Sequence, residues 1–170
     1  AINFGILYGM GARALGQSIG VKAKEAQAFI DEYFERLPKV RTWIDSTIEQ
    51  AREDEEVRTL YGRRRKLPEL RSKDPRQKAF GERIAVNTPI QGTAADLIKI
   101  AMIRLDERIR RDQLPVRMLL QVHDELVFEV DDAHRDEVRK VVCEEMEHVA
   151  DLRVPLAVEA GFGATWAEAH

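Results

Sequence analysis

Two apolar runs near the end of the chain constrain its fold more than any other feature of the 170-residue sequence. They cover residues 116–122 and 126–130, and their aliphatic, β-branched composition is typical of strands. Only His123, Asp124 and Glu125 separate them, so the two runs lie close enough to pair as an antiparallel hairpin. The sequence therefore predicts a rigid hairpin with three ionisable side chains at or near its turn.

Helical periodicity dominates the sequence before this hairpin. Amphipathic spacing predicts helices over residues 22–36 and 40–53, which form a helical hairpin around Pro38. Helical spacing returns over residues 80–110, where Pro89 predicts a bend or a break because proline cannot donate the helical hydrogen bond. Other patterns predict a strand, a turn and a basic continuation over 57–67, a loop over 71–78, a helix over 133–150 and a strand over 154–161. This order of elements predicts an α+β fold with an antiparallel sheet covered by helices on one face.

Charge is distributed unevenly along the chain. The 27 Lys and Arg residues against 30 Asp and Glu give a formal net charge of −3, which by itself does not indicate a nucleic-acid-binding protein. Residues 58–78, however, contain nine basic side chains against only Glu69 and Asp74. Side chains of this segment such as Arg63 and Arg64 could contact phosphates, and as a charge run it could equally be only solvated.

Three further features bear on the setting of the chain. Cys143 is the only cysteine, so no internal disulfide can form, and its presence alone suggests a reducing compartment. The sequence has no secretory pattern and no apolar run of the roughly 20 residues that a membrane span needs. We therefore expect a cytoplasmic protein that makes no membrane contact. The uncapped helical turn of residues 2–8 also suggests a fragment of a longer chain.

The hairpin turn is the first candidate site. A carboxylate held there by two packed strands can bind a divalent cation at a fixed point, as phosphoryl chemistry requires. Asp124 could instead bond a nearby backbone amide in a solvated turn, and the three ionisable residues alone do not decide between these alternatives. Zinc is not favoured, since the sequence contains no HExxH motif and no histidine at ligand spacing from His123.

Several longer motifs resemble those of the family A DNA polymerases, the bacterial DNA polymerase I family. In chain order they are the stretch NFGILYG at 3–9, the stretch RIAVNTPIQGTAAD at 83–96, the stretch QVHDE at 121–125 and the ending at 166–170. They resemble, respectively, the latter half of the second polymerase motif on the fingers helix, the palm helix pair, the third polymerase motif and the C-terminus of the family. The resemblance spans essentially the whole chain. It implies a fingers-like helical region with a basic hairpin at 1–78 and the C-terminal palm region at 79–170.

The resemblance implies roles for the hairpin residues. Asp124 would be one of two aspartates that hold a catalytic pair of Mg²⁺ ions, and Glu125, the second catalytic residue, would support the metal or the primer terminus. His123 would contact the primer end. The palm strand that carries the other aspartate is absent from this sequence, as are the Arg and Lys of the fingers helix that hold the triphosphate.

Three polar side chains at a spacing of four residues, Arg83, Asn87 and Gln91, can address one groove of a duplex. Arginine and neutral amides suit the minor-groove acceptors that all base pairs share, so such a face can check shape without demanding sequence. A solvated polar face is the simpler interpretation of these residues by themselves. The resemblance implies that they contact the primer–template duplex.

Phe4 and Tyr8 lie about one helical turn apart and, taken alone, would be core residues. The resemblance implies instead that Phe4, Tyr8 and Gly9 face the incoming nucleotide and the templating base, as a stacking platform. Phenylalanine at position 4 further implies discrimination against dideoxynucleotides. The resemblance also places Arg63 and Arg64 along the DNA backbone.

These observations favour the C-terminal part of the polymerase domain of a DNA-directed DNA polymerase, with primer–template DNA and deoxynucleoside triphosphates as partners. The parent would be a monomeric, nucleoid-associated bacterial enzyme that uses Mg²⁺. Because half of the metal site is missing, we expect the isolated chain to lack useful polymerase activity. A non-catalytic module that binds primer–template DNA is the alternative function, and an α+β domain with a merely polar turn has the least support.

Overall fold

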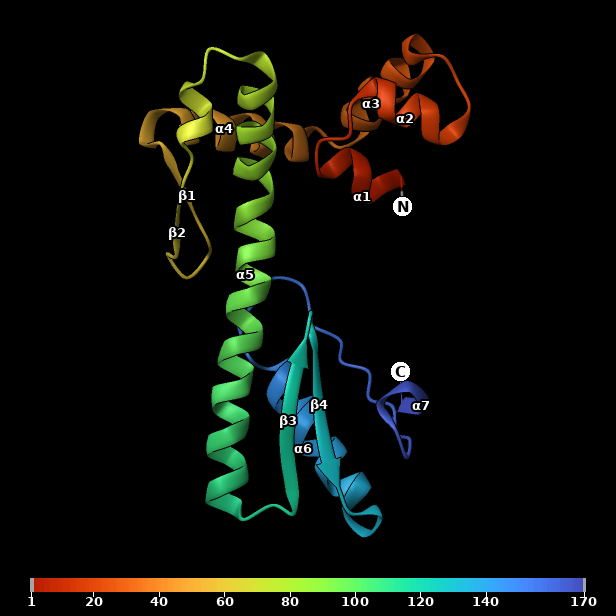
Figure 1. Cartoon of the computed structure of the whole chain (residues 1–170), viewed down its shortest axis with the longest axis vertical. Coiled ribbons are helices and arrows are strands. Elements are labelled where there is room, and N and C mark those ends of the chain that lie inside the picture. Colours follow the sequence, from red (N-terminus) through yellow and green to blue (C-terminus); the bar gives the residue numbers. More distant parts are fainter. Residues whose placement is uncertain (1, 170) are drawn as a thin grey trace. The chain divides into compact units, whose positions relative to one another are not determined.

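The computed structural model describes residues 2–169 of the chain (Figure 1). The chain divides into two compact units, an N-terminal unit, Ala1–Thr93, and a C-terminal unit, Ala94–His170. The described residues are mainly helical, and their strands form two separate two-stranded antiparallel sheets. The predicted α+β class is therefore confirmed.

The N-terminal unit opens with four helices: α1 (Ile2–Leu7), α2 (Ala12–Ile19), α3 (Ala23–Arg36) and α4 (Pro38–Asp54). Helix α3 begins where the Glu25 carboxylate accepts a hydrogen bond of 3.2 Å from the backbone N–H of Lys22. Helix α4 has Pro38 in its first turn, where the missing N–H has no helical partner to lose. The apolar side chains Ile6, Leu15, Ala26 and Ile30 form the core of this region. Both helices predicted over 22–53 are confirmed.

A short hairpin follows in the same unit. Strand β1 (Glu56–Arg58) pairs with strand β2 (Arg64–Lys66), and Val57 lies opposite Arg65. A short 3-10 helix, η1 (Pro68–Arg71), comes next. The strand and turn predicted over 57–67 are confirmed. A second core cluster joins the hairpin to its neighbours and consists of Ala51, Val57, Leu67, Leu70 and Ala85.

Helix α5 (Pro75–Asp112) runs without interruption through Pro89, so the predicted break is wrong (Figure 1). A proline inside a helix removes one N–H donor, here the one that would reach the carbonyl of Ala85. The 38-residue helix tolerates that single loss. The Thr93 hydroxyl also donates to the Pro89 carbonyl at 2.5 Å, which adds a bond one turn after the proline.

The start of α5 corrects a second prediction, the loop over 71–78. The Asp74 carboxylate accepts a 2.9 Å hydrogen bond from the backbone N–H of Arg76, and Pro75 is the first helical residue. An acceptor side chain followed by proline is a recognised helix start, and this signal lay in the sequence. Only the first half of the predicted loop is non-helical or 3-10 in form.

In the C-terminal unit, strand β3 (Val116–Val122) pairs with strand β4 (Glu125–Val130), as predicted (Figure 1). The 3-10 turn η2 (Asp132–His134) and helix α6 (Arg135–Glu147) follow, and α7 (Trp166–Ala169) ends the described residues. Ion pairing links α5 to α6, because the Arg108 guanidinium lies 3.0 Å from the Glu145 carboxylate. The buried apolar side chains of this unit are Ala101, Leu105, Val138 and Val149.

The strand predicted over residues 154–161 is wrong, because this segment has no regular secondary structure. Val154 is 66% exposed, and Pro155 has no N–H to offer a neighbouring strand. The backbone N–H of Val158 donates to the Glu147 side chain at 3.3 Å instead of to a strand. A strand needs a partner edge, and composition alone cannot supply one.

The single cysteine and the apolar character of the helices can also be described. Cys143 is a free, partly buried thiol on α6. Among the residues that the structure describes, no helix combines the length and the apolar character needed to cross a membrane.

Candidate functional site

The hairpin turn of the C-terminal unit consists of His123 and Asp124 alone, because Val122 pairs directly with Glu125. His123 adopts φ = 53°, in the left-handed region that two-residue hairpin turns use and that non-glycine residues rarely occupy. The Gln121 carboxamide donates a short hydrogen bond to the backbone carbonyl of His123. The turn is thus fixed from within by the side chain that precedes it.

Gln121 is a residue whose role the sequence interpretation missed, although it lies inside the QVHDE motif. It is a long neutral amide that directly follows the apolar stretch 118–120 of the strand, and this contrast was the available signal. Its amide donates to the backbone carbonyl of His123 within the turn, so Gln121 helps to hold the backbone that carries the next two side chains. A role in holding a turn cannot be distinguished from ligand contact by sequence alone.

The two carboxylates of the turn differ in their surroundings. Asp124 is exposed at the end of the hairpin, whereas Glu125 is partly buried at the start of β4. An exposed carboxylate on a rigid turn can supply one oxygen ligand to Mg²⁺, which otherwise keeps several waters. Within residues 2–169, no three His, Cys, Asp or Glu side chains are grouped closely enough to hold a metal ion. Asp124 therefore fits one ligand of a divalent-metal site, and this unit offers no complete cage among its described residues.

The aromatic residues predicted in the N-terminal unit lie on one face of helix α1 and its end. The rings of Phe4 and Tyr8 are stacked, with centroids 6.3 Å apart and planes inclined by 15°. Phe4 is 65% exposed, so the core alternative is wrong for this residue. Tyr8 is partly buried beneath it. The pair presents an open aromatic face of the kind on which a base or a sugar can pack.

Gly9 and Arg83 are brought together by the fold, although they are far apart in the sequence. Gly9 has φ = +87°, and a β-carbon at this residue would lie 3.0 Å from Cγ of Arg83. The guanidinium of Arg83 also lies over the ring of Phe80, 5.8 Å from its centroid. The end of α1 at Gly9 and the side chain of Arg83 on α5 are therefore in contact and form one continuous surface.

Asn87 and Gln91 follow Arg83 at intervals of about one turn on the uninterrupted helix α5. Since the helix does not break at Pro89, the three side chains form one stripe along it. Gln91 is exposed, and Asn87 is partly buried. The Asn87 Oδ1 atom is buried without a hydrogen-bond partner in the part of the chain that the structure describes. A buried acceptor of this kind gains stability from any donor brought to it.

The basic hairpin presents Arg63 at its turn and Arg64 at the start of β2, and both side chains are exposed. Arg64 lies 3.9 Å from the carboxylate of Glu56, at the limit of an ion pair. Arg65 points the other way, since its guanidinium lies 3.5 Å from the hydroxyl of Thr88 on α5. Arg64 is therefore only weakly engaged and is available to an anionic partner.

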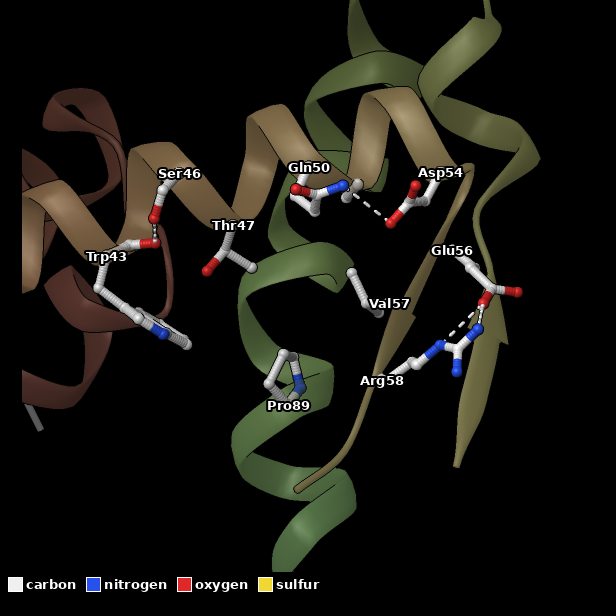
Figure 2. A pocket seen from close by; sticks show the side chains of 10 residues that line it. Trp43, Ser46, Thr47, Gln50, Asp54, Glu56, Val57, Arg58 and Pro89 are labelled. Atoms are coloured by element: carbon white, nitrogen blue, oxygen red, sulfur yellow. Dashed lines mark hydrogen bonds and ion pairs between the residues drawn. The ribbon is translucent and has the colours of Figure 1, made fainter. Parts of the chain in front are cut away.

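A shallow hollow of the N-terminal unit contains none of the predicted site residues (Figure 2). Trp43, Val57 and Pro89 contribute apolar surface from α4, β1 and α5. Its acidic side chains are already engaged, because Asp54 accepts from Gln50 and Glu56 accepts from Arg58. This hollow lacks the free positive charge that a phosphate-bearing ligand needs, so it adds nothing to the candidate site.

Comparison with known proteins identifies the family. The family described as DNA polymerase family A matches this chain over residues 1–168. The chain belongs to this family, which confirms the resemblance seen in the sequence motifs.

Bacterial relatives match nearly the whole chain. The chain is 50% identical to a thermostable DNA polymerase I of Thermus filiformis over 168 residues, 99% of this chain and 20% of the relative. It is 49% identical to DNA polymerase I of Pseudomonas aeruginosa over 174 residues, 100% of this chain and 19% of the relative. The chain thus spans about a fifth of the length of these curated relatives.

A solved structure resembles the whole chain. It is the POL domain of Pol1 from M. smegmatis in complex with DNA primer-template and dNTP. The TM-score is 0.94 at 42% sequence identity, over 99% of this chain and 30% of that one. The fold described above is therefore that of part of a polymerase domain.

Proposed function

We propose that this chain is the C-terminal part of the polymerase domain of a DNA-directed DNA polymerase. In this function, a nucleotide is transferred from a deoxynucleoside triphosphate to the 3′-hydroxyl of a primer under the direction of a template. The observation that carries the proposal is the likeness, over 99% of the chain, to a polymerase domain described with primer-template and dNTP. The exposed Asp124 at the tip of a rigid hairpin and the polar stripe of α5 support it independently.

Asp124 is proposed as a ligand of the Mg²⁺ pair, with Glu125 beside it. When bound, the metal ions supply the positive charge that activates the primer hydroxyl and neutralises the triphosphate. The protein itself contributes the position of this residue, because two paired strands and the Gln121 side chain hold the backbone of the turn that carries Asp124. His123, adjacent in the turn, is proposed to contact the primer end.

The N-terminal unit is proposed to hold the nucleotide and the duplex. The exposed Phe4 ring and the end of α1 at Tyr8 and Gly9 would pack against the incoming nucleotide and the templating base. Arg83, Asn87 and Gln91 would reach minor-groove acceptors. The exposed arginines 63 and 64 would meet phosphates, which position DNA without selecting its sequence.

The metal role of Asp124 is tested by primer extension with the full-length protein. We expect Asp124→Ala to lower the rate of nucleotide incorporation by roughly 100-fold or more, because a carboxylate ligand of the metal is lost. Asp151→Ala, which removes an exposed carboxylate from an irregular segment, is the matched control and should retain activity. Equal incorporation by the Asp124→Ala variant would exclude a metal role for this residue.

The chain by itself is proposed to lack useful polymerase activity, since its described residues provide no complete set of protein ligands for a metal ion. The second candidate function, binding of primer–template DNA without catalysis, applies to this isolated state and is favoured by the exposed arginines of the β1–β2 hairpin. Primer extension and DNA binding by the purified chain separate the two. Robust incorporation would contradict inactivity, and absence of salt-dependent DNA binding would contradict the binding function.

We also propose that the whole protein is monomeric and acts in the bacterial cytoplasm in association with the nucleoid. The cellular location follows from the proposed substrate, since a polymerase that copies a duplex works where the chromosome lies. The bacterial origin of its relatives supports the cellular setting.

A further inference from the structure

The tip of the basic hairpin, which strands β1 and β2 form, is hydrogen-bonded to helix α5 at Thr93. The backbone N–H of Leu60 donates a hydrogen bond of 2.9 Å to the Thr93 hydroxyl oxygen. The same hydroxyl donates to the carbonyl of Pro89 at 2.5 Å. A hydroxyl group has one proton and two lone pairs, so Thr93 uses its donor within the helix and an acceptor toward the hairpin.

The hairpin approaches the helix too closely at this point for an ordinary side chain. A β-carbon at Gly92 would lie 2.6 Å from the Cγ2 methyl of Thr59, and Thr59 is only 6% exposed. The backbone N–H of Thr59 also donates to the carbonyl of Arg63 at 3.0 Å, which closes the turn of the hairpin. The contact is therefore built from backbone and small groups, with little freedom to slide.

A second contact lies about one turn earlier on the helix. The Arg65 guanidinium reaches the hydroxyl of Thr88, which is 9% exposed, at 3.5 Å. Thr88, Gly92 and Thr93 consequently face the hairpin from consecutive turns of α5. The intervening Gln91 is exposed, and Asn87 precedes the same segment by one residue.

The hairpin needs such an attachment. Its strands contain three residues each, and isolated two-stranded hairpins are marginally stable in water. Without a fastening at its tip, the side chains of Arg63 and Arg64 would sample many positions relative to Asn87 and Gln91.

We propose that Thr93 is a positioning residue, whose hydroxyl holds the basic hairpin on helix α5 so that hairpin arginines and helix amides meet DNA as one surface. This inference rests on the proposed function, since it requires that the surface binds primer–template DNA. Thr93 itself needs no contact with the nucleic acid. Its effect passes through the hairpin, and that indirect route is what distinguishes a positioning residue from a ligand-binding one.

The test uses the full-length protein and a primer–template duplex, with Kd measured across a series of salt concentrations. Thr93→Val keeps the branched shape and removes the hydroxyl, so we expect Kd to rise about 5-fold, the effect of one hydrogen bond. The slope of log Kd against log salt should fall by about one, as for one lost phosphate contact. Thr93→Ser restores the hydroxyl and should restore both values.

A thermodynamic cycle identifies the route of the effect. In a background of Arg63→Ala and Arg64→Ala, the hairpin no longer offers these charges, so Thr93→Val should weaken binding by less than about 2-fold. An equal loss of affinity in both backgrounds would overturn the proposal, because Thr93 would then act on the helix or on folding alone.

Gly92→Ala gives an independent variant that leaves the hydroxyl in place. Its β-carbon would collide with Thr59 and displace the same hairpin, so we expect the same loss of affinity and of salt dependence. Unchanged binding by both Thr93→Val and Gly92→Ala would overturn the positioning role. A wild-type protein that does not bind the duplex would instead overturn the proposed function, so the two failures are distinguishable.

Discussion

Glu125 lies directly opposite Val122 in the β3–β4 ladder, which leaves His123 and Asp124 as the entire connection between the strands. A connection this short has few possible conformations, and His123 accepts a left-handed one at φ = 53°. The side chain of Gln121 bonds the carbonyl of His123 and holds it there. The position of Asp124 is therefore a consequence of strand register, not of the aspartate itself.

The strain at His123 can be separated from its proposed contact with the primer. His123→Gly removes the conformational penalty of a left-handed non-glycine residue, roughly 1 kcal/mol, so the urea midpoint of the full-length protein should not fall. Nucleotide incorporation should fall, because the imidazole is lost. Gln113→Gly is the matched control, because Gln113 has φ = 51° just after α5 and lies outside the candidate site. Loss of incorporation in the control as well would mean that general rigidity, not the imidazole, matters.

Gly9 should tolerate no side chain. Alanine there must adopt φ = +87° with its β-carbon 3.0 Å from Cγ of Arg83, so either the end of α1 or the arginine must move. We expect Gly9→Ala to lower kcat/KM for nucleotide incorporation roughly 10- to 100-fold, as misplacement of binding groups does. Gly11→Ala is the control, since a β-carbon at Gly11 would have no other atom within 4 Å and its φ is −79°. Similar losses in both variants would argue against a specific role for the contact between Gly9 and Arg83.

Pro89 should be dispensable for the path of helix α5. Pro89→Ala supplies the missing N–H within an intact helix and leaves the carbonyl that Thr93 bonds, so stability should rise by about 1 kcal/mol or more. Urea unfolding of the full-length protein measures the change. A clear decrease would mean that the proline ring packs productively against Trp43 and Val57 in the hollow of Figure 2.

Acid should weaken the end of helix α5. Hydrogen bonds from Arg111 and Arg108 lower the pKa of Asp112 from 3.8 to about 2. Because the folded-state pKa is the lower one, this stabilisation is complete above pH 3.8 and is lost as the pH falls toward 2. The stability difference between the wild type and Asp112→Asn should therefore shrink over this interval, as measured by urea unfolding at each pH. A difference that stays constant with pH would contradict ionic stabilisation by Asp112.

The sequence was sufficient where a pattern was long or a connection was short. Residues 116–130 could pair only with each other at such close range, and the helices over 22–53 repeat their apolar positions through several turns. The predicted break at Pro89 was wrong because the loss of one hydrogen bond costs a long helix little of its stability. The predicted strand over residues 154–161 was wrong because a strand requires a partner strand, which composition does not reveal.

The candidate site likewise has some features that the sequence could predict and others that depend on the fold. The motifs named Phe4, Arg83 and Asp124 as individual residues, and side-chain spacing placed Arg83 in line with Asn87 and Gln91. No pattern in the sequence indicates that Gly9 lies against Arg83, since that contact depends on the path of the chain between α1 and α5. The role of Gln121 was hidden for a related reason, because its partner is a backbone carbonyl and not a recognisable side chain.

The two-residue turn between β3 and β4 also limits how this region of the chain can change in length. Side chains alternate between the two faces of a strand, so one residue inserted after Val122 could be absorbed only as a bulge or by turning every following side chain of β4 to the opposite face. Substitutions in the strands can be compensated by repacking, whereas an insertion in the turn would move the carboxylate of Asp124 itself. The number of residues at this turn is thus under as strong a constraint as their chemical identity.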